Sequence, residues 1–225
     1  ALKGMTDALQ HRGPDATGHF SEKAVSLGHI RLSIIDLSTH ANQPMFSHNK
    51  RYVIVFNGEI YNYNEIAKQL GIEQKTTSDT EVILEALAKK GTESINLFNG
   101  MYAIALYDRE EETLTLIRDR VGIKPLFYFW DGSHFAFASE LKALLKLEIV
   151  KQNLKINHKA VNDYLHLGFI PEPQTIYENI YKFPASSYGV LKENHFNIEK
   201  YWSISEQINA QTISHEKEAK EKLKE

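Results

Sequence analysis

The sequence contains no cysteine among its 225 residues. This absence excludes disulfides, thiolate metal sites and a thiol nucleophile encoded within these residues. It does not define the compartment, although it is compatible with a cytoplasmic protein, which is the localisation we expect. Long apolar runs are also absent, because none approaches the roughly 18 residues of a membrane span, and no signal-peptide pattern opens the chain. The sequence therefore predicts no membrane partner.

An excess of positive charge is absent as well. The 26 lysines and arginines are balanced by 29 aspartates and glutamates, which gives a net charge of −3. Nucleic-acid-binding domains usually carry a basic excess or stripe, so no nucleic-acid partner is predicted. The ten histidines show no His-Glu-x-x-His or other ligand spacing, so no metal site is predicted either. The 42% apolar content is sufficient for a full buried core.

The order of the predicted elements indicates one α+β body. Ser78 and Glu81 form a capping-box pattern at the start of one helix, and Gly91 follows its end. Strand runs that lie between pairs of helices indicate sheets covered by helices on their outer faces. We predict a strand pair over 25–36, strands over 52–56, 101–107, 113–118, 126–129 and 134–138, helices over 63–70, 79–90, 140–146 and 158–167, and a late hairpin over 186–202.

The two ends of the sequence differ from this body. Residues 2–10 have the periodicity of an amphipathic helix, and a chain that opens inside a helix predicts a missing upstream segment. No aromatic residue occurs over 203–225, where Glu216/Lys220 and Glu218/Lys222 have the spacing of helical ion pairs. This tail is expected to be a solvated helix or the first helix of another domain.

Seven motifs occur in an order that resembles one family. They are His11–Asp15 (HRGPD), Gly28–Asp36 (GHIRLSIID), Phe56–Asn62 (FNGEIYN), Thr77–Glu81 (TSDTE), Phe98–Ala103 (FNGMYA), Arg118–Leu126 (RDRVGIKPL) and Phe137–Leu144 (FASELKAL). This set resembles the glutaminase domain of the glutamine-hydrolysing asparagine synthetases, which are class II glutamine amidotransferases. The resemblance implies an αββα four-layer sandwich of the N-terminal nucleophile hydrolase type over residues 1–202, without its first strand. Residues 203–225 would then be a linker and the first helix of a truncated synthetase domain.

Asn57 and Gly58 are the candidate catalytic residues. Amide hydrolysis needs a nucleophile, a base and a stabiliser of the tetrahedral oxyanion. A side-chain amide and an adjacent unhindered backbone N–H at the end of a buried strand are able to point at one oxygen. The dipeptide taken alone predicts a hairpin turn. The resemblance instead implies that this pair forms the oxyanion hole.

Arg31 and Asp79 are the candidate recognition residues. Arg31 lies in an apolar stretch, and a buried arginine needs a partner, which could be Asp36 or Glu59. The resemblance implies that Arg31 binds the α-carboxylate of L-glutamine, whereas Asp79 binds its α-ammonium with Glu59 beside it. Asp79 also suits the first turn of a helix, and the two roles are compatible. The wall of the site is implied to contain Leu32, Ile34 and Ile35.

Other motif residues are predicted to support the structure. Arg12 and Asp15 could hold their loop by an ion pair. The segments 118–126 and 139–142 are expected to brace the sandwich or its interface with a second domain.

This chain departs from the pattern of the family at the nucleophile. The family uses an amino-terminal cysteine with its own α-amino group as the base. We expect an upstream strand bearing this cysteine, and consider a loss of glutaminase chemistry as the alternative. The implied function is hydrolysis of L-glutamine to glutamate and ammonia, for ATP-dependent amidation of aspartate or another acid by a C-terminal synthetase domain. The alternative function is a glutamine-binding or purely structural domain.

The resemblance also implies which cofactors and partners to expect. The phosphate loop of the synthetases is absent from these residues, so ATP and Mg²⁺ are expected only in the synthetase domain and no cofactor is expected here. The expected partners are L-glutamine and the protein's own synthetase domain, and a homodimer is compatible with the family.

Overall fold

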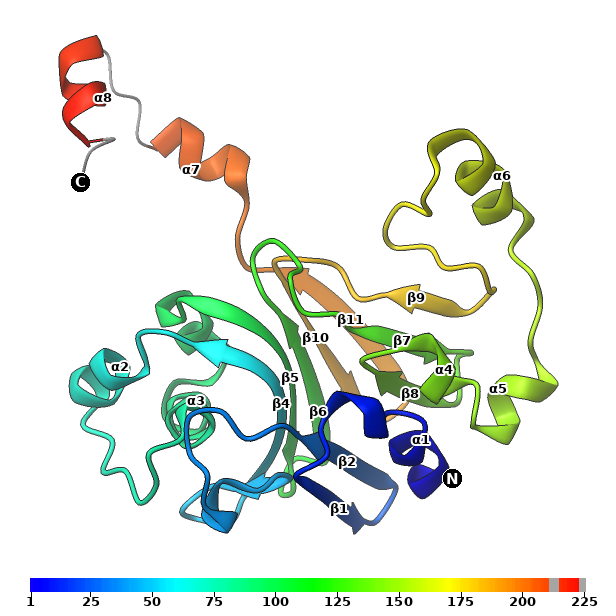
Figure 1. Cartoon of the computed structure of the whole chain (residues 1–225), viewed down its shortest axis with the longest axis horizontal. Helices are drawn as coiled ribbons and strands as arrows, with labels where there is room; N and C mark the ends of the chain where they lie inside the picture. The colour runs from blue at the N-terminus through cyan, green and yellow to red at the C-terminus, as the bar shows by residue number, and fades with distance from the viewer. Residues whose placement is uncertain (211–214, 223–225) are drawn as a thin grey trace.

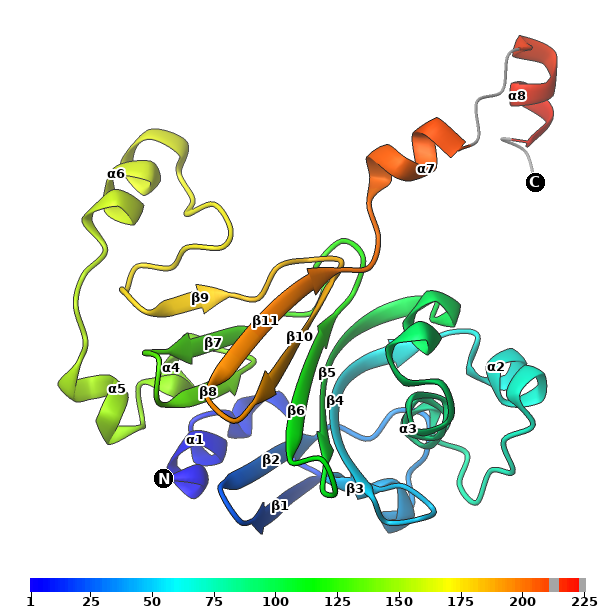
Figure 2. The ribbon, with the colours of Figure 1, turned by 180° about the vertical axis from the view of Figure 1, so that it is seen from behind.

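The computed structural model describes residues 1–210 and 215–222. Figures 1 and 2 show two layers of β-structure from opposite sides, with helices outside each layer. The strands are β1 (Ala16–Glu22), β2 (Val25–Arg31), β3 (Met45–Phe46), β4 (Tyr52–Ile60), β5 (Gly100–Asp108), β6 (Thr113–Arg118), β7 (Phe127–Trp130), β8 (Phe135–Ala138), β9 (Ile180–Lys182), β10 (Ser187–Lys192) and β11 (His195–Lys200). The α-helices are α1 (Leu2–Asp7), α2 (Tyr63–Leu70), α3 (Asp79–Lys90), α4 (Leu141–Leu144), α5 (Glu148–Gln152), α6 (His158–Leu167), α7 (Ile204–Ala210) and α8 (Glu216–Lys222).

The layers form the predicted αββα sandwich. One sheet has the strand order β11-β10-β6-β5-β4-β3 with antiparallel pairing, and α2 and α3 cover its outer face. The second layer contains the β1-β2 hairpin and the sheet β8-β7-β9. Helices α1, α4 and α5 pack on the outer side of this layer (Figure 1).

Alternation along β4 explains why a separate core forms on each face of this strand. Ile54 and Phe56 pack beneath α2 and α3, whereas Val53 and Val55 pack between the two β-layers. Successive side chains of a strand point to opposite faces, so a strand that is buried on both faces is apolar throughout. Each such side chain contributes about 1.5–3 kcal/mol when it is fully buried. By the same alternation Asn57 faces the space between the two layers.

An apolar cleft of about 320 Å³ lies between the two parts of the second layer. Val25 and Leu27 of β2 line one side, Phe137 and Ala138 of β8 line the other, and Val55 contributes to its floor. Among the described residues, β2 pairs only with β1 and β8 only with β7. Two strand edges with hydrogen-bonding groups therefore border the cleft.

Helix and strand positions were well predicted where periodicity and caps agree. The helices predicted over 63–70, 79–90 and 158–167 match α2, α3 and α6 residue for residue, and the strand over 113–118 matches β6. Gly71, Gly91 and Gly168 end the three helices with positive φ, which glycine adopts without strain. The late hairpin is present as β10 and β11.

The strand pair predicted over 25–36 was misplaced. The hairpin is formed by β1 and β2 over residues 16–31, and residues 32–36 leave the sheet. Asp15 accepts a hydrogen bond from Ser33 N–H at 2.7 Å, and Asp36 accepts one from Ser38 N–H at the same distance. These bonds between side-chain carboxylates and backbone N–H groups replace the ladder despite the β-branched composition of the segment.

Three short elements were missed and the tail is partly described. No strand or helix was predicted at β3, β9 or α5, which are two, three and five residues long. The predicted pairs Lys220–Glu216 and Lys222–Glu218 are formed on α8 at 2.6 and 3.3 Å. The rest of the tail prediction falls partly on residues 211–214 and 223–225, which lie outside the described residues.

Candidate active site

A polar cavity of about 300 Å³ adjoins the apolar cleft at the end of β2. Its walls come from β2, the segment after β2, the second half of β4 and the first turn of α3. The cavity brings together every residue for which we predicted a role in the site. These are Arg31, Leu32, Ile34, Ile35, Asn57, Gly58, Glu59 and Asp79.

Arg31 is held by neutral acceptors. Its Nη1 donates to Ser38 O at 2.7 Å and to Asn42 Oδ1 at 2.6 Å, and Nη2 donates to Asp36 O. The alternative of an ion pair with Asp36 or Glu59 is wrong, because the contact with residue 36 is to its carbonyl oxygen. Arg31 is only 8% exposed, and among the described residues its guanidinium bonds neutral oxygens and pairs with no carboxylate.

The hydrogen bonds of Arg31 leave one edge of the guanidinium for a ligand. A guanidinium has five N–H groups in a rigid plane, and two on Nη1 and one on Nη2 are in use. Within the described residues, the donors that remain without a partner are on Nε and Nη2, the two nitrogens that together are able to form a fork matching a carboxylate. The positive charge of Arg31 is therefore available to an anionic group in the cavity.

Asp79 supplies negative charge to the same cavity. The residue is 5% exposed, and its Oδ2 accepts a hydrogen bond from Ile60 N–H at 3.0 Å. Burial raises the pKa of Asp79, the bond from Ile60 opposes this shift, and the nearby Glu59 adds to it. A cation bound beside Asp79 and Glu59 would relieve the cost of this buried charge.

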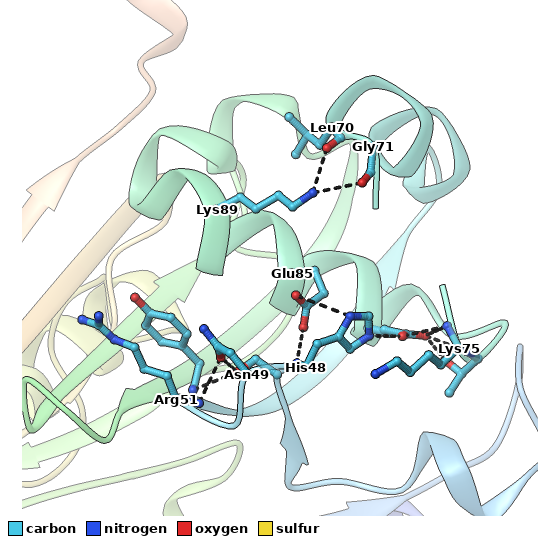
Figure 3. A network of polar contacts seen from close by, with 12 residues as sticks. His48, Asn49, Arg51, Leu70, Gly71, Lys75, Glu85 and Lys89 are labelled. Carbon is cyan, nitrogen blue, oxygen red and sulfur yellow. Dashed lines mark hydrogen bonds and ion pairs between the residues drawn. The ribbon is translucent and has the colours of Figure 1, made fainter. Parts of the chain in front are cut away.

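The first turn of α3 is held in place by two acidic side chains. Ser78 caps the helix and accepts from Thr80 N–H at 3.2 Å, but Glu81 does not complete the predicted capping box. Glu81 instead accepts from the backbone N–H groups of Lys75 and Thr76, at 2.8 and 2.7 Å, and it pairs with His48. Figure 3 shows the His48 ring between Glu85 and the segment at Lys75. These contacts fix the loop that leads to Asp79.

Asn57 and Gly58 lie inside β4, so the alternative of a hairpin turn is wrong. Asn57 is opposite Ala103 and Gly58 is opposite Tyr102 in an unbroken ladder. A Cβ at residue 58 would lie 2.1 Å from Met101 O, so only glycine fits against β5 at this point. The predicted end of the strand at this dipeptide is corrected to Ile60.

The backbone of β4 directs the Gly58 N–H toward the cavity side. Phe56 N–H donates to Gln43 Oε1 at 2.6 Å, and Ile60 N–H donates to Asp79 Oδ2, so both point away from β5. Because alternate residues of a strand direct their N–H groups to the same edge, Gly58 N–H points the same way. The Asn57 side-chain nitrogen Nδ2 is buried and has no hydrogen-bond partner among the described residues.

Among the residues of the cavity lining that were not predicted for the site, Gln43 and His29 carry polar groups close to the predicted residues. Gln43 is buried and joins β4 to α3, because its amide also donates to Thr80 Oγ1 at 3.3 Å. His29 lies two positions before Arg31 on β2, and its Nε2 bonds Phe56 O at 3.1 Å. The sequence signal that could have revealed His29 is its spacing of two residues from Arg31, because residues i and i+2 of a strand lie on the same face.

The loop at residues 11–15 is held differently from the prediction. Arg12 pairs with Glu140 at 2.9 Å, and His11 bonds the same carboxylate at 2.8 Å. Asp15 is bound to Ser33 N–H, so the expected Arg12–Asp15 ion pair is wrong. The bracing role of Arg118 agrees with its bonds to the carbonyl groups of Lys124 and Gly122, at 2.8 and 2.9 Å.

Replacing Asp79 by asparagine is expected to stabilise the fold. Asparagine retains an oxygen for Ile60 N–H but carries no charge. Because the pKa of Asp79 is raised in the folded state, its ionisation destabilises the fold as the pH rises from the ordinary carboxyl range through the raised pKa. We expect a gain of about 1 kcal/mol at pH 7 and less at pH 4, measured by urea unfolding.

Glu81→Gln is the matched control for this stability change. Burial alone would raise the pKa of Glu81, but the bonds from Lys75, Thr76 and His48 outweigh it and lower the pKa. The Glu81 carboxylate therefore stabilises the fold above its unfolded pKa, and this contribution is lost as the pH falls through the lowered pKa. The control should lose stability at pH 7. A change of the same sign in both variants would contradict the assignment.

Comparison with known proteins identifies the family to which this chain belongs. The family described as "Glutamine amidotransferase domain" matches residues 1–202. The chain belongs to this family. The chain is also similar to proteins named glutamine-hydrolyzing asparagine synthetase 1 and 3 from Bacillus subtilis (strain 168), each 34% identical. The matches cover 91% and 89% of this chain, and 32% and 33% of the two relatives. This amidotransferase chain thus spans about a third of the length of those relatives.

The fold of the amidotransferase is shared with a solved structure. Glutamine phosphoribosylpyrophosphate amidotransferase from B. subtilis, complexed with ADP and GMP, superposes with a TM-score of 0.55 at 19% identity. The match covers 79% of this chain and 35% of the other. It shows the N-terminal nucleophile hydrolase fold. Across residues 1–210 and 215–222, no helix has the length and apolar character required to cross a membrane.

Proposed function

We propose that this domain binds L-glutamine and hydrolyses its side-chain amide when a nucleophile is supplied to the cavity. The observation that carries the proposal is the placement of Arg31, Asp79 and Asn57 Nδ2 around one small cavity, where Nδ2 has no partner in the part of the chain that the structure describes. A free α-amino acid carries a carboxylate and an ammonium group, which match Arg31 and Asp79 with Glu59. A peptide-linked glutamine lacks both charges and would leave the buried charges of the cavity unpaired.

Asn57 and Gly58 stabilise the charge that develops during hydrolysis. Attack on the carboxamide carbon converts its carbonyl oxygen into an oxyanion. Asn57 Nδ2 and Gly58 N–H are two donors on the cavity side of β4 that could bind this oxygen. The tetrahedral intermediate then releases ammonia and leaves an acyl-enzyme, and water releases glutamate from it. The net reaction converts glutamine and water into glutamate and ammonia.

The apolar cleft between β2 and β8 is the entry for the nucleophile. We propose that a strand outside these 225 residues pairs with the two bordering edges and fills the cleft. The cleft and the cavity share His29 and Asn57 in their linings, so a residue at the end of this strand would reach the oxyanion donors. A cysteine at the amino terminus of that strand would supply both the thiolate and, through its α-amine, the base.

A second domain is the proposed partner that receives ammonia. The relatives are about three times as long as this chain. Leu32 and Ile34 at the cavity, and Val121 and Ile123 in the nearby loop with Lys124, expose large apolar side chains. Exposed apolar patches of this kind usually mark an interaction surface. We assign this surface to a synthetase domain that binds ATP and Mg²⁺ and amidates aspartate or another carboxylate.

The second candidate function is glutamine binding without hydrolysis, which the absence of cysteine favours. Calorimetry with L-glutamine and an assay of glutamate release separate the two. We expect the 225-residue chain to bind glutamine without releasing glutamate. The same chain extended by a strand with an amino-terminal cysteine should release glutamate, and its cysteine-to-alanine control should not. Binding without release by the extended chain would support the second candidate, and absence of glutamine binding by both chains would contradict both.

A further inference from the structure

Two buried polar atoms belong to residues that line both the cleft and the cavity. Among the described residues, His29 Nδ1 and Asn57 Nδ2 are the buried side-chain polar atoms that have no hydrogen-bond partner. Both residues line both spaces. An unpaired buried polar group costs about 1–3 kcal/mol, so two such groups in the linings of the same two spaces point to a ligand that satisfies both.

The hydrogen bonding of His29 defines which atom carries a proton. Nε2 bonds Phe56 O at 3.1 Å, and a carbonyl oxygen only accepts, so Nε2 carries the N–H. Burial lowers the pKa of His29 to about 4, the bond to Phe56 opposes this shift, and Arg31 adds to it. The ring is therefore neutral at pH 7, and Nδ1 presents a lone pair that accepts a hydrogen bond.

The pair of groups is complementary to a carboxamide. Asn57 Nδ2 donates and His29 Nδ1 accepts, whereas a carboxamide offers one oxygen acceptor and one NH₂ donor. A carboxylate offers two acceptors and no donor, so one of its oxygens would face the lone pair of Nδ1. We propose that His29 distinguishes glutamine from glutamate. Its Nδ1 accepts a hydrogen bond from the N–H of the ligand carboxamide, whose oxygen binds Asn57 and Gly58. This inference rests on the proposed function.

The spacing along β2 supports this placement. Residues i and i+2 of a strand share a face and lie about 7 Å apart. His29 and Arg31 have this relation, and both line the cavity. The extended chain of glutamine places its carboxamide and its α-carboxylate at similar separation, so the two side chains are able to contact opposite ends of one ligand. Hydrolysis would then remove the N–H group that donates a hydrogen bond to His29, and this loss would favour the release of glutamate.

Two substitutions separate this role from a structural one. In His29→Gln the side-chain amide nitrogen takes the place of Nε2, so the bond to Phe56 O is retained and the acceptor at Nδ1 is removed. In His29→Asn the side-chain oxygen takes the place of Nδ1, so the acceptor is retained and the bond to Phe56 is lost. If the role of His29 were purely structural, the protein would tolerate the His29→Gln substitution better than His29→Asn.

The experiment is calorimetry of L-glutamine and L-glutamate binding to the 225-residue chain at pH 7.5, with melting temperatures for every variant. We expect wild type to prefer glutamine by at least about tenfold in Kd. His29→Gln should reduce this preference by about tenfold or more. His29→Asn should retain it within about threefold, although its melting temperature should fall.

The outcomes separate this inference from the proposed function. An unchanged preference in His29→Gln, or a loss in His29→Asn as large as that in His29→Gln, overturns the inference. Asp79→Asn serves as the control for the site itself and should weaken glutamine binding at least about tenfold. If glutamine binding did not depend on Asp79, the proposed function would fail. If it depended on Asp79 and His29→Gln kept the preference, only the inference would fail.

Discussion

Replacing Arg31 by alanine is expected to raise the KM for glutamine about 100-fold or more in a full-length protein that hydrolyses glutamine, with a much smaller fall in kcat. In the proposed function, the fork of donors on Nε and Nη2 binds a carboxylate that is distant from the reacting amide. Its contribution is therefore nearly equal in the ground state and the transition state, and the loss of such uniform binding appears in KM. Loss of a buried, charge-assisted pair costs about 2–5 kcal/mol.

A substrate without the α-carboxylate provides the control for Arg31. 4-Aminobutanamide retains the amine and the carboxamide of glutamine. Wild type should use it as poorly as Arg31→Ala uses glutamine, and the variant should show little further loss with it. Arg31 also donates hydrogen bonds to Ser38 and Asn42, so its loss could affect the fold. The variant Arg31→Lys keeps the positive charge but not the fork of donors, and its melting temperature is measured together with that of Arg31→Ala. A fall in kcat with an unchanged KM would assign Arg31 to the chemical step.

Replacing Asn57 by alanine is expected to reduce kcat about 10²–10³-fold with little change in KM, because it removes one donor to the oxyanion. The expected loss is confined to kcat since the charge on the oxygen develops only in the transition state. The measurement is glutamate release by the full-length protein at saturating glutamine. Release at the wild-type rate would contradict the oxyanion assignment.

Asn57→Asp is the matched variant for this effect. It keeps the size and shape of the side chain but replaces the donor with a second acceptor that is negatively charged at neutral pH. Glutamate release should fall at least as far as in Asn57→Ala. The native Asn57 Nδ2 is buried without a partner, so loss of this nitrogen removes no hydrogen bond within the described residues. A large fall in melting temperature for Asn57→Ala would therefore indicate a structural role instead.

The sequence predicted the layers of the fold because the burial pattern repeats along its strands and helices. The run 52–56 is apolar at every position since β4 is buried by helices on one face and by the second layer on the other. The helix 79–90 was located by Ser78 at one end and Gly91 at the other. Short elements such as β9 have too few residues to show a period, and they form because β7 offers an edge.

The site residues were predicted by family resemblance, and their bonding was not predictable from the sequence. Arg31 was expected to need a carboxylate, but Asp36 uses its carboxylate for Ser38 and Thr77 and offers Arg31 a carbonyl. Glu81 had the spacing of a capping box, but the loop at Lys75 and Thr76 competes for it. Such choices depend on which distant backbone groups lack partners, and only the folded chain determines that.

The most direct test of the account is a structure of this chain with L-glutamine bound. Since these residues contain no cysteine, the ligand should remain intact. We predict the α-carboxylate on Nε and Nη2 of Arg31, the α-ammonium beside Asp79 and Glu59, and the carboxamide oxygen within hydrogen-bond distance of Asn57 Nδ2 and Gly58 N–H. Glutamine bound outside this cavity, or bound with its carboxamide away from Asn57, would contradict the central claim.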